Sequence, residues 1–122
     1  LVVAASCELV IVRGGKVLLV WREDAHYRGW HTPGGYIGPG ESRQASVTRI
    51  ASKELGCEPQ FVRIIEAFIQ DDNPRLPDES NLFLCTLPDG VEPAKGQWFD
   101  LCPPDILVHH RKFWEPISKY LK

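Results

Sequence analysis

The sequence predicts an α+β domain in which a mixed β-sheet is sandwiched between helices. Two apolar, β-branched segments flank a two-glycine turn near the N-terminus, and an amphipathic segment follows a proline- and glycine-rich turn in the middle of the chain. Further apolar strands then precede a closing helical segment. A chain of 122 residues has the length of one domain, so we assign residues 1–122 to a single domain.

The first two strands form a hairpin. The segment CELVIVRGGKVLLVWRE, residues 7–23, is rich in Val, Ile and Leu on both sides of Gly14 and Gly15. Glycines supply the positive φ angles that a tight hairpin turn needs. A polar connection follows, and residues 30–32 are expected to form a short third strand that ends at a Pro-Gly-Gly turn.

The central helix is expected to begin after Pro39 and Gly40. Glu41 or Ser42 can cap its first turn, and Gly56 lies just past its last turn, where a left-handed residue is favoured. At 100° per residue, one arc of the helix is apolar and should be buried. That arc consists of Val47, Ala51 and Leu55.

The second half of the chain contains three strand candidates and a closing helix. The strands are expected at residues 60–69, 81–87 and 96–101, with a polar loop at residues 71–80 and the helix at residues 109–121. Pro116 must strain or interrupt that helix, because proline cannot donate the helical N–H bond. The expected order is therefore β-β-β-α-β-β-β-α.

Composition excludes several classes of protein. The formal net charge of -2 gives no bulk attraction to nucleic acid, so any polyanion must be held by a local site. No stretch approaches the roughly 20 apolar residues that span a bilayer. The segment LVVAASC resembles the end of a lipoprotein signal, but no basic region precedes it and we read a strand instead. The four cysteines form no C-x-x-C pair, which favours free thiols and a cytoplasmic protein.

From Gly35 onward the chain resembles the Nudix (MutT-like) hydrolase family. The family signature is G-x5-E-x7-R-E-U-x-E-E-x-G-U, where U is a bulky apolar residue. Its matching positions, without a gap, are Gly35, Glu41, Arg49, Glu54 and Gly56. The flanking segments WHTPGG and QWF resemble the family's entry turn and its late tryptophan strand. The resemblance covers nearly the whole chain and implies the Nudix fold.

The resemblance also implies a metal site. Two linked phosphates repel an attacking water, and a divalent cation neutralises that charge. The Gly35 carbonyl and the Glu54 carboxylate are the implied ligands of Mg²⁺ or Mn²⁺, which prefer oxygen donors. Glu41 and Arg49 are implied to form an ion pair that orients the site. Taken singly, Glu41 could be only a carboxylate at a helix start and Arg49 only a solvated residue.

Two positions depart from the signature. Ile50 and Lys53 stand where the family has glutamates, so the helix loses two negative charges and gains one positive charge. We therefore expect one ion at most. Ile50 could extend the core, and Lys53 could be a solvated lysine or a phosphate clamp. Glu92 lies six residues before Trp98, where MutT-type members place a glutamate, and we expect it to bind the metal or activate water.

Substrate contacts are expected outside this helix. Tyr27 and Trp30 could stack on a nucleobase, although most aromatic residues of the chain are expected in the core. The polar loop at residues 71–80 is the other candidate, with Arg75 as a partner for phosphate or ribose.

The expected function is hydrolysis of the pyrophosphate in a nucleoside diphosphate linked to another moiety, with one divalent cation. A first alternative is a nucleotide-sugar glycosyl hydrolase of the GDP-mannose mannosyl hydrolase type, whose reduced signature resembles RIASKELG. Those enzymes use a histidine near the late tryptophan. In this chain Pro93, and not a histidine, follows Glu92, so His109 or His110 would have to supply the imidazole. A second alternative is an inactive domain that binds nucleotide or protein. The family also implies a possible homodimer.

Overall fold

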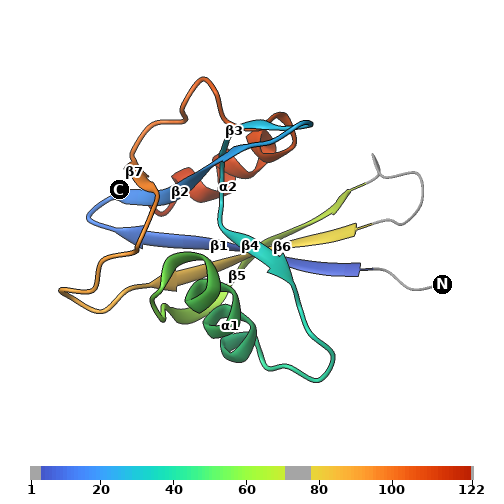
Figure 1. Ribbon diagram of the computed structural model, residues 1–122, viewed down its shortest axis with the longest axis vertical. Coiled ribbons are helices and arrows are strands. Elements are labelled where there is room, and N and C mark those ends of the chain that lie inside the picture. Colours follow the sequence, from blue (N-terminus) through green and yellow to red (C-terminus); the bar gives the residue numbers. More distant parts are fainter. Residues whose placement is uncertain (1–3, 71–77, 122) are drawn as a thin grey trace.

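The computed structural model describes residues 4–70 and 78–121 of the chain. In chain order the elements are β1 Ala4–Arg13, β2 Lys16–Glu23, β3 Arg28–His31, β4 Gly34–Tyr36, α1 Arg43–Leu55, β5 Gln60–Gln70, β6 Asp78–Thr86, β7 Gln97–Phe99, the 3₁₀ helix η1 Val108–Phe113 and α2 Trp114–Ser118. Figure 1 shows α1 on one side of the β1–β6 pair and α2 on the other. The α+β architecture with helices on both sides of a mixed sheet is confirmed.

Strand β1 is the centre of the sheet. The strand order is β3-β2-β1-β6-β5, while β4 pairs with β1 and β7 pairs with β2. The β1–β6 pairing is parallel, and the other pairings are antiparallel. β2 joins β1 only at Val12 and Arg13, whereas β4 lies beside Ser6 to Glu8. The same strand therefore connects the hairpin to the glycine turn of the signature.

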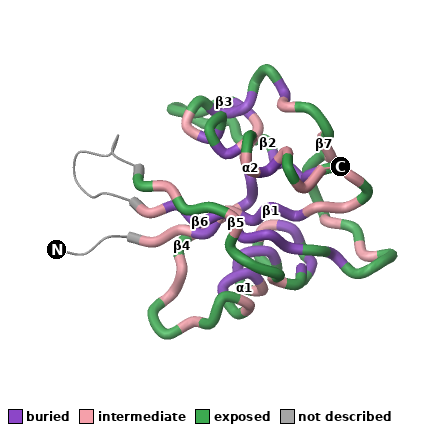
Figure 2. Tube along the Cα trace, turned by 180° about the vertical axis from the view of Figure 1, so that it is seen from behind, coloured by how far each residue is buried: buried purple, intermediate pink, exposed green. Residues whose placement is uncertain are grey.

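The side chains of each strand point alternately to the two faces of the sheet, and an apolar core lies on each face. Residues of β1 that face α1 are Cys7, Leu9 and Ile11, and they belong to the first apolar cluster. Val10 points to the other face and packs in a second cluster with Phe113 and Ile117 of the C-terminal helices. Figure 2 shows buried chain along β1 and β6, between the two helical layers.

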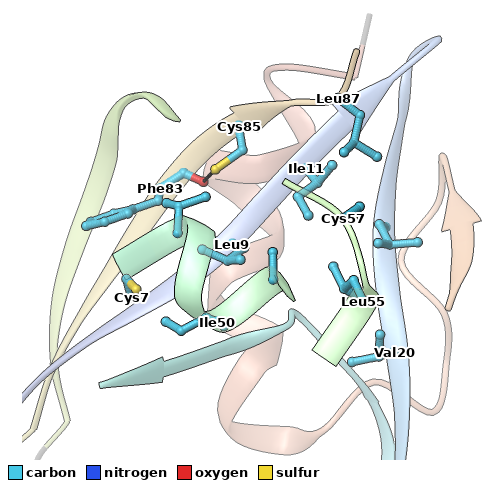
Figure 3. Close-up of a cluster of buried hydrophobic side chains, with 13 residues drawn as sticks. Cys7, Leu9, Ile11, Val20, Ile50, Leu55, Cys57, Phe83, Cys85 and Leu87 are labelled. Carbon is cyan, nitrogen blue, oxygen red and sulfur yellow. Dashed lines mark hydrogen bonds between the residues drawn. The ribbon is translucent and has the colours of Figure 1, made fainter. Parts of the chain in front are cut away.

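Local signals explain the ends of α1. The Ala45 N–H donates to Ser42 Oγ at 3.1 Å, so Ser42 caps the helix, and Gly56 ends it in the left-handed region with φ 65°. The predicted buried arc of Val47, Ala51 and Leu55 is fully buried. Ile50 is also buried, with 4% of its surface exposed. Figure 3 shows Ile50 among the apolar side chains between α1 and the sheet.

The structure differs from the sequence prediction in three places. Strand β4 was expected to be only a turn, but Gly34 and Gly35 pair with Glu8 and Cys7 of β1. Strand β6 begins at Asp78, inside the segment that was expected to be a loop. The closing segment is a 3₁₀ helix followed by the short α2, and Pro116 lies in the first turn of α2, where a missing N–H breaks no helical bond.

The cysteines carry no disulfide in the described residues. Cys7, Cys57, Cys85 and Cys102 are free thiols, and the first three are buried. Cys7 lies within β1, as the strand prediction requires. Within residues 4–70 and 78–121, no helix combines the length and apolar character needed to cross a membrane.

Candidate active site

A cavity of about 1160 Å³ lies beside Gly34 and Gly35 of β4. Side chains from α1, β1, β2, η1 and the loop before β7 line it. The two glycines open onto opposite faces of the sheet. A Cβ at Gly35 would lie 3.3 Å from Ile50, on the α1 face, whereas a Cβ at Gly34 would lie 2.6 Å from Glu8 Oε2. Strand β4 therefore lies between Ile50 of α1 and the Glu8 side of the cavity.

One end of the cavity carries charges of both signs. Lys53 and Glu54 come from the last turn of α1, and Lys95 comes from the loop before β7. That loop is fixed to the helix end because the Ala94 N–H donates to the Leu55 carbonyl at 2.8 Å. Burial raises the pKa of Glu54, and the positive charges of Lys95 and Lys53 oppose this shift. Two lysines and the helix carboxylate thus line one cavity.

The turn before α1 is held by the ion pair that the signature implies. Arg49 Nε donates to Glu41 Oε2 at 2.7 Å, and an Arg49 Nη donates to Glu41 Oε1 at 2.8 Å. Glu41 Oε1 also accepts from the Gly38 N–H and the Ser46 hydroxyl. Hydrogen bonds from Arg49, then Ser46 and Gly38, lower the pKa of Glu41 to about 2. The carboxylate is therefore charged at any physiological pH and ties the turn to the helix.

The donors at this end are of the kind that a divalent cation prefers. Glu54 is partly buried, and no hydrogen bond or ion pair to its carboxylate occurs within residues 4–70 and 78–121. Gly35 lines the same cavity. Magnesium is commonly bound by one or two carboxylates, with water and substrate oxygens completing its shell. No group of three or more His, Cys, Asp or Glu side chains suited to a metal occurs in the described part of the chain.

A second carboxyl group, Glu8, lies deeper in the cavity. The Thr32 hydroxyl donates to Glu8 Oε2 at 2.8 Å. Burial raises the pKa of Glu8 to about 7, the Thr32 bond opposes the shift, and the charge of Glu54 adds to it. Sequence reasoning missed Glu8. The available signal was a glutamate inside the otherwise apolar run CELVIV, at a position that alternation assigns to the face opposite α1.

Histidines occupy the same deep end. His31, His109 and His110 all line the cavity, and His110 Nδ1 lies 3.3 Å from Thr32 Oγ1. Burial, followed by the neighbouring His109 and His31, lowers the pKa of His110 to about 3. His110 is therefore neutral near pH 7. Its ring centroid lies 4.9 Å from that of Phe113, which packs in the second core.

Several predicted site residues are not brought together. Glu92 forms an ion pair with Arg13 at 3.0 Å, and it does not line the cavity that Glu54 lines. Trp30 packs against the second core, with its ring 4.9 Å from Phe99 between centroids. Tyr27 does line the cavity. Arg75 and most of the predicted contact loop lie outside the described residues.

Comparisons with known proteins identify the family of the chain. The model of the NUDIX domain matches residues 2–121. A Bacillus subtilis (strain 168) protein, provisionally named an 8-oxo-dGTP diphosphatase, is 30% identical over 88 residues, which are 72% of this chain and 56% of that protein. The chain thus spans little more than half the length of this relative.

Solved structures show the same fold. A UDP-X diphosphatase superposes with a TM-score of 0.77 and 21% identity, covering 98% of this chain and 63% of the other. A MutT NUDIX hydrolase from Burkholderia pseudomallei gives a TM-score of 0.75 at 21% identity and covers all of both chains. With the family model matched over almost its whole length, this chain belongs to the NUDIX domain family.

Proposed function

We propose that the protein is a hydrolase of phosphoric anhydrides that cleaves the pyrophosphate of a nucleoside diphosphate linked to another moiety. The observation that carries the proposal is the position of Glu54, which lines one cavity together with Gly35 and two lysines. The names of the Bacillus subtilis relative and of the UDP-X diphosphatase describe enzymes that act on phosphoric anhydrides, which supports the proposal.

Nudix hydrolases generally use divalent metals. We infer one Mg²⁺ or Mn²⁺ ion held by the Gly35 carbonyl and the Glu54 carboxylate. When bound, such an ion neutralises phosphate charge and acidifies water. Lys53 and Lys95 bind the remaining phosphate oxygens as point charges, and their positive charge stands in for that of a second cation. Arg49 and Glu41 position the turn that follows Gly35.

Metal titration with a substrate panel tests this proposal. The purified chain is incubated with nucleoside diphosphate sugars, dinucleotides and nucleoside triphosphates over a range of Mg²⁺ and Mn²⁺ concentrations. Metal-dependent release of a nucleoside monophosphate is the expected result for at least one compound. Tight nucleotide binding without turnover of any compound would favour the alternative of an inactive binding domain.

Cleavage at the sugar carbon is the second candidate. The chain has no histidine directly after Glu92, but His109 and His110 both line the cavity and could supply the imidazole for this reaction. Hydrolysis of a nucleotide sugar in ¹⁸O-labelled water separates the two reactions. Attack at phosphorus places the label in a phosphate product, whereas attack at carbon places it in the released sugar.

The homodimer that the family implies and the predicted role of Glu92 both stay predictions. Sedimentation equilibrium of the purified chain tests the first. The comparison of carboxylate variants described in the Discussion tests the second.

A further inference from the structure

The loop between β6 and β7, residues 87–96, brings Lys95 to the cavity that Glu54 lines. Figure 1 shows this loop in orange. Burial raises the pKa of Glu54, and of the two lysines that oppose this shift Lys95 has the larger effect. Within residues 4–70 and 78–121, no hydrogen bond or ion pair holds the Lys95 ammonium. The backbone of the loop must therefore determine where this charge lies.

Arg13, the last residue of β1, holds the first part of this loop. Its guanidinium donates to the Pro88 carbonyl at 3.0 Å and to the Val91 carbonyl at 2.7 Å. It also donates to Glu92 Oε1 at 3.0 Å, and its Cζ lies 5.4 Å from the centroid of the Trp98 ring. One side chain thus contacts the start of the loop and the strand that follows it.

The two carbonyl contacts of Arg13 matter more than its ion pair. The Glu92 side chain is 71% exposed, and an ion pair in such a position contributes little. The contact with the Val91 carbonyl is partly buried, and a charged donor makes it roughly twice as strong as a neutral hydrogen bond. Pro88 and Val91 also bound a turn, in which the Val91 N–H donates to the Pro88 carbonyl at 3.2 Å. Arg13 therefore fixes the backbone of that turn.

The second part of the loop is attached to α1 and β2. The Ala94 N–H donates at 2.8 Å to the carbonyl of Leu55, the last residue of α1, and so satisfies a carbonyl that has no partner within the helix. Gly96 has φ 102°, and a Cβ there would lie 2.8 Å from the Leu19 carbonyl oxygen. Lys95 lies between these two contacts, so its backbone is fixed on both sides.

We propose that Arg13 is a positioning residue for the hydrolysis, because it fixes the loop that places the Lys95 ammonium against the diphosphate beside Glu54. The assignment rests on the proposed function, since it takes a diphosphate as the ligand of Lys95. Arg13 does not line the cavity, so it acts only through the loop. A lysine binds phosphate as a point charge on a flexible stem, and the energy of that contact depends on the distance that the backbone allows.

A double-mutant cycle tests the coupling of Arg13 to Lys95 without requiring turnover. The probe is methylenediphosphonate, a diphosphate analogue that water does not cleave. Calorimetry at one Mg²⁺ concentration gives its affinity for the wild type, Arg13→Ala, Lys95→Gln and the double variant. Each single change should weaken binding about fivefold or more. The double variant should bind no more weakly than Lys95→Gln alone, because Arg13 acts through Lys95. Additive losses would overturn the proposal, and so would undetectable binding to the wild type at millimolar concentrations.

Arg63→Ala is the matched control for the loss of charge. Arg63 also donates a hydrogen bond, to the Tyr120 hydroxyl at 2.7 Å, and its Cζ lies 5.2 Å from the centroid of that ring. It lies on β5 and does not line the cavity. Arg63→Ala should therefore leave the affinity for methylenediphosphonate unchanged. A loss equal to that of Arg13→Ala would show that net charge, and not the position of Lys95, decides binding.

Arg13→Lys gives a second route if Arg13→Ala folds poorly. It keeps the positive charge, but a lysine lacks the planar fork that contacts both carbonyls of the turn. Hydrogen exchange of the Ala94 N–H should become about tenfold or more faster, while amides in the middle of α1 keep their rates. An unchanged exchange rate at Ala94 would contradict the positioning role.

The cycle also separates this inference from the proposed function. A chain in which Arg13 and Lys95 are coupled but which hydrolyses nothing refutes the proposed function and leaves this inference standing. Metal-dependent hydrolysis with independent effects of the two residues does the reverse.

Discussion

Arg49 clamps the carboxylate of Glu41 with two hydrogen bonds, at 2.7 and 2.8 Å, and donates a third at 2.7 Å to the Tyr36 carbonyl. The guanidinium thus holds the turn that follows Gly35 onto the surface of α1. Half of the Arg49 side chain is exposed, and exposed ion pairs contribute little to folding stability. The clamp therefore matters for the geometry of the site more than for the fold.

Arg49→Lys is expected to reduce kcat by about tenfold or more, because a lysine cannot make the paired contact that fixes the turn. The melting temperature should change little. Arg43→Lys, at an exposed position of the same helix, is the control and should leave both quantities unchanged. Steady-state kinetics and thermal unfolding monitored by circular dichroism supply the two readouts. A large loss of stability with normal kcat would assign the pair a structural role only.

The two predicted acidic ligands can be separated by their variants. Glu54→Gln should abolish metal-dependent turnover and weaken Mn²⁺ binding measured by electron paramagnetic resonance. Because Glu92 is held by Arg13 outside the cavity, Glu92→Gln should bind Mn²⁺ like the wild type. Weak binding in both variants would instead place Glu92 at the metal, as the spacing to Trp98 predicts.

Lys53→Glu restores a glutamate of the family signature. If Lys53 binds substrate phosphate, the reversal of charge should raise KM and lower kcat/KM by about tenfold or more. Lys119→Glu, at an exposed position after α2, controls for the change in net charge. Higher activity in Lys53→Glu would show that the lysine marks a decayed metal site and does not replace an ion.

Local patterns predicted much of the fold. Gly14 and Gly15 both adopt positive φ in the predicted hairpin turn, and Ser42 and Gly56 bound the predicted helix. These features depend on neighbours within a few residues, so the sequence alone reveals them. Strand β4 was missed because its pairing with β1 joins segments that are distant in the chain.

The sequence predicted the part of the site that lies in one helix and the turn before it. The Arg49–Glu41 pair and the position of Glu54 were implied by the spacing of the family signature, which lies in one helix and the turn before it. Glu8 and Lys95 reach the cavity only through sheet pairing and through the loop bound to the end of α1, and no local pattern encodes that convergence. The offset used for Glu92 assumes a loop length, and in this chain the loop places Glu92 beside Arg13.

Ile50→Glu restores the other glutamate of the signature, and it should destabilise the protein. Ile50 is 4% exposed and packs in the first core, so truncation in Ile50→Ala should already cost about 2–5 kcal/mol. A glutamate there adds the desolvation of a charge. Ser52→Glu, exposed on the same helix, is the control. Urea unfolding measures the effect, and an Ile50→Glu variant of normal stability and higher activity would contradict the core role.

Protonation of His110 should make the folded state sensitive to acid. Its pKa is about 3 in the folded protein, below the ordinary value of 6.5, so the unfolded chain binds the proton more readily between these values. The contribution of His110 to stability should therefore be level above about pH 6.5 and fall as the pH decreases toward 3, by up to about 1.4 kcal/mol per pH unit. His110→Asn should flatten this decline, whereas His26→Asn, at an exposed position, should not. Urea unfolding followed by tryptophan fluorescence from pH 4 to pH 8 gives the comparison, and equal acid sensitivity of the two variants would exclude His110 as its source.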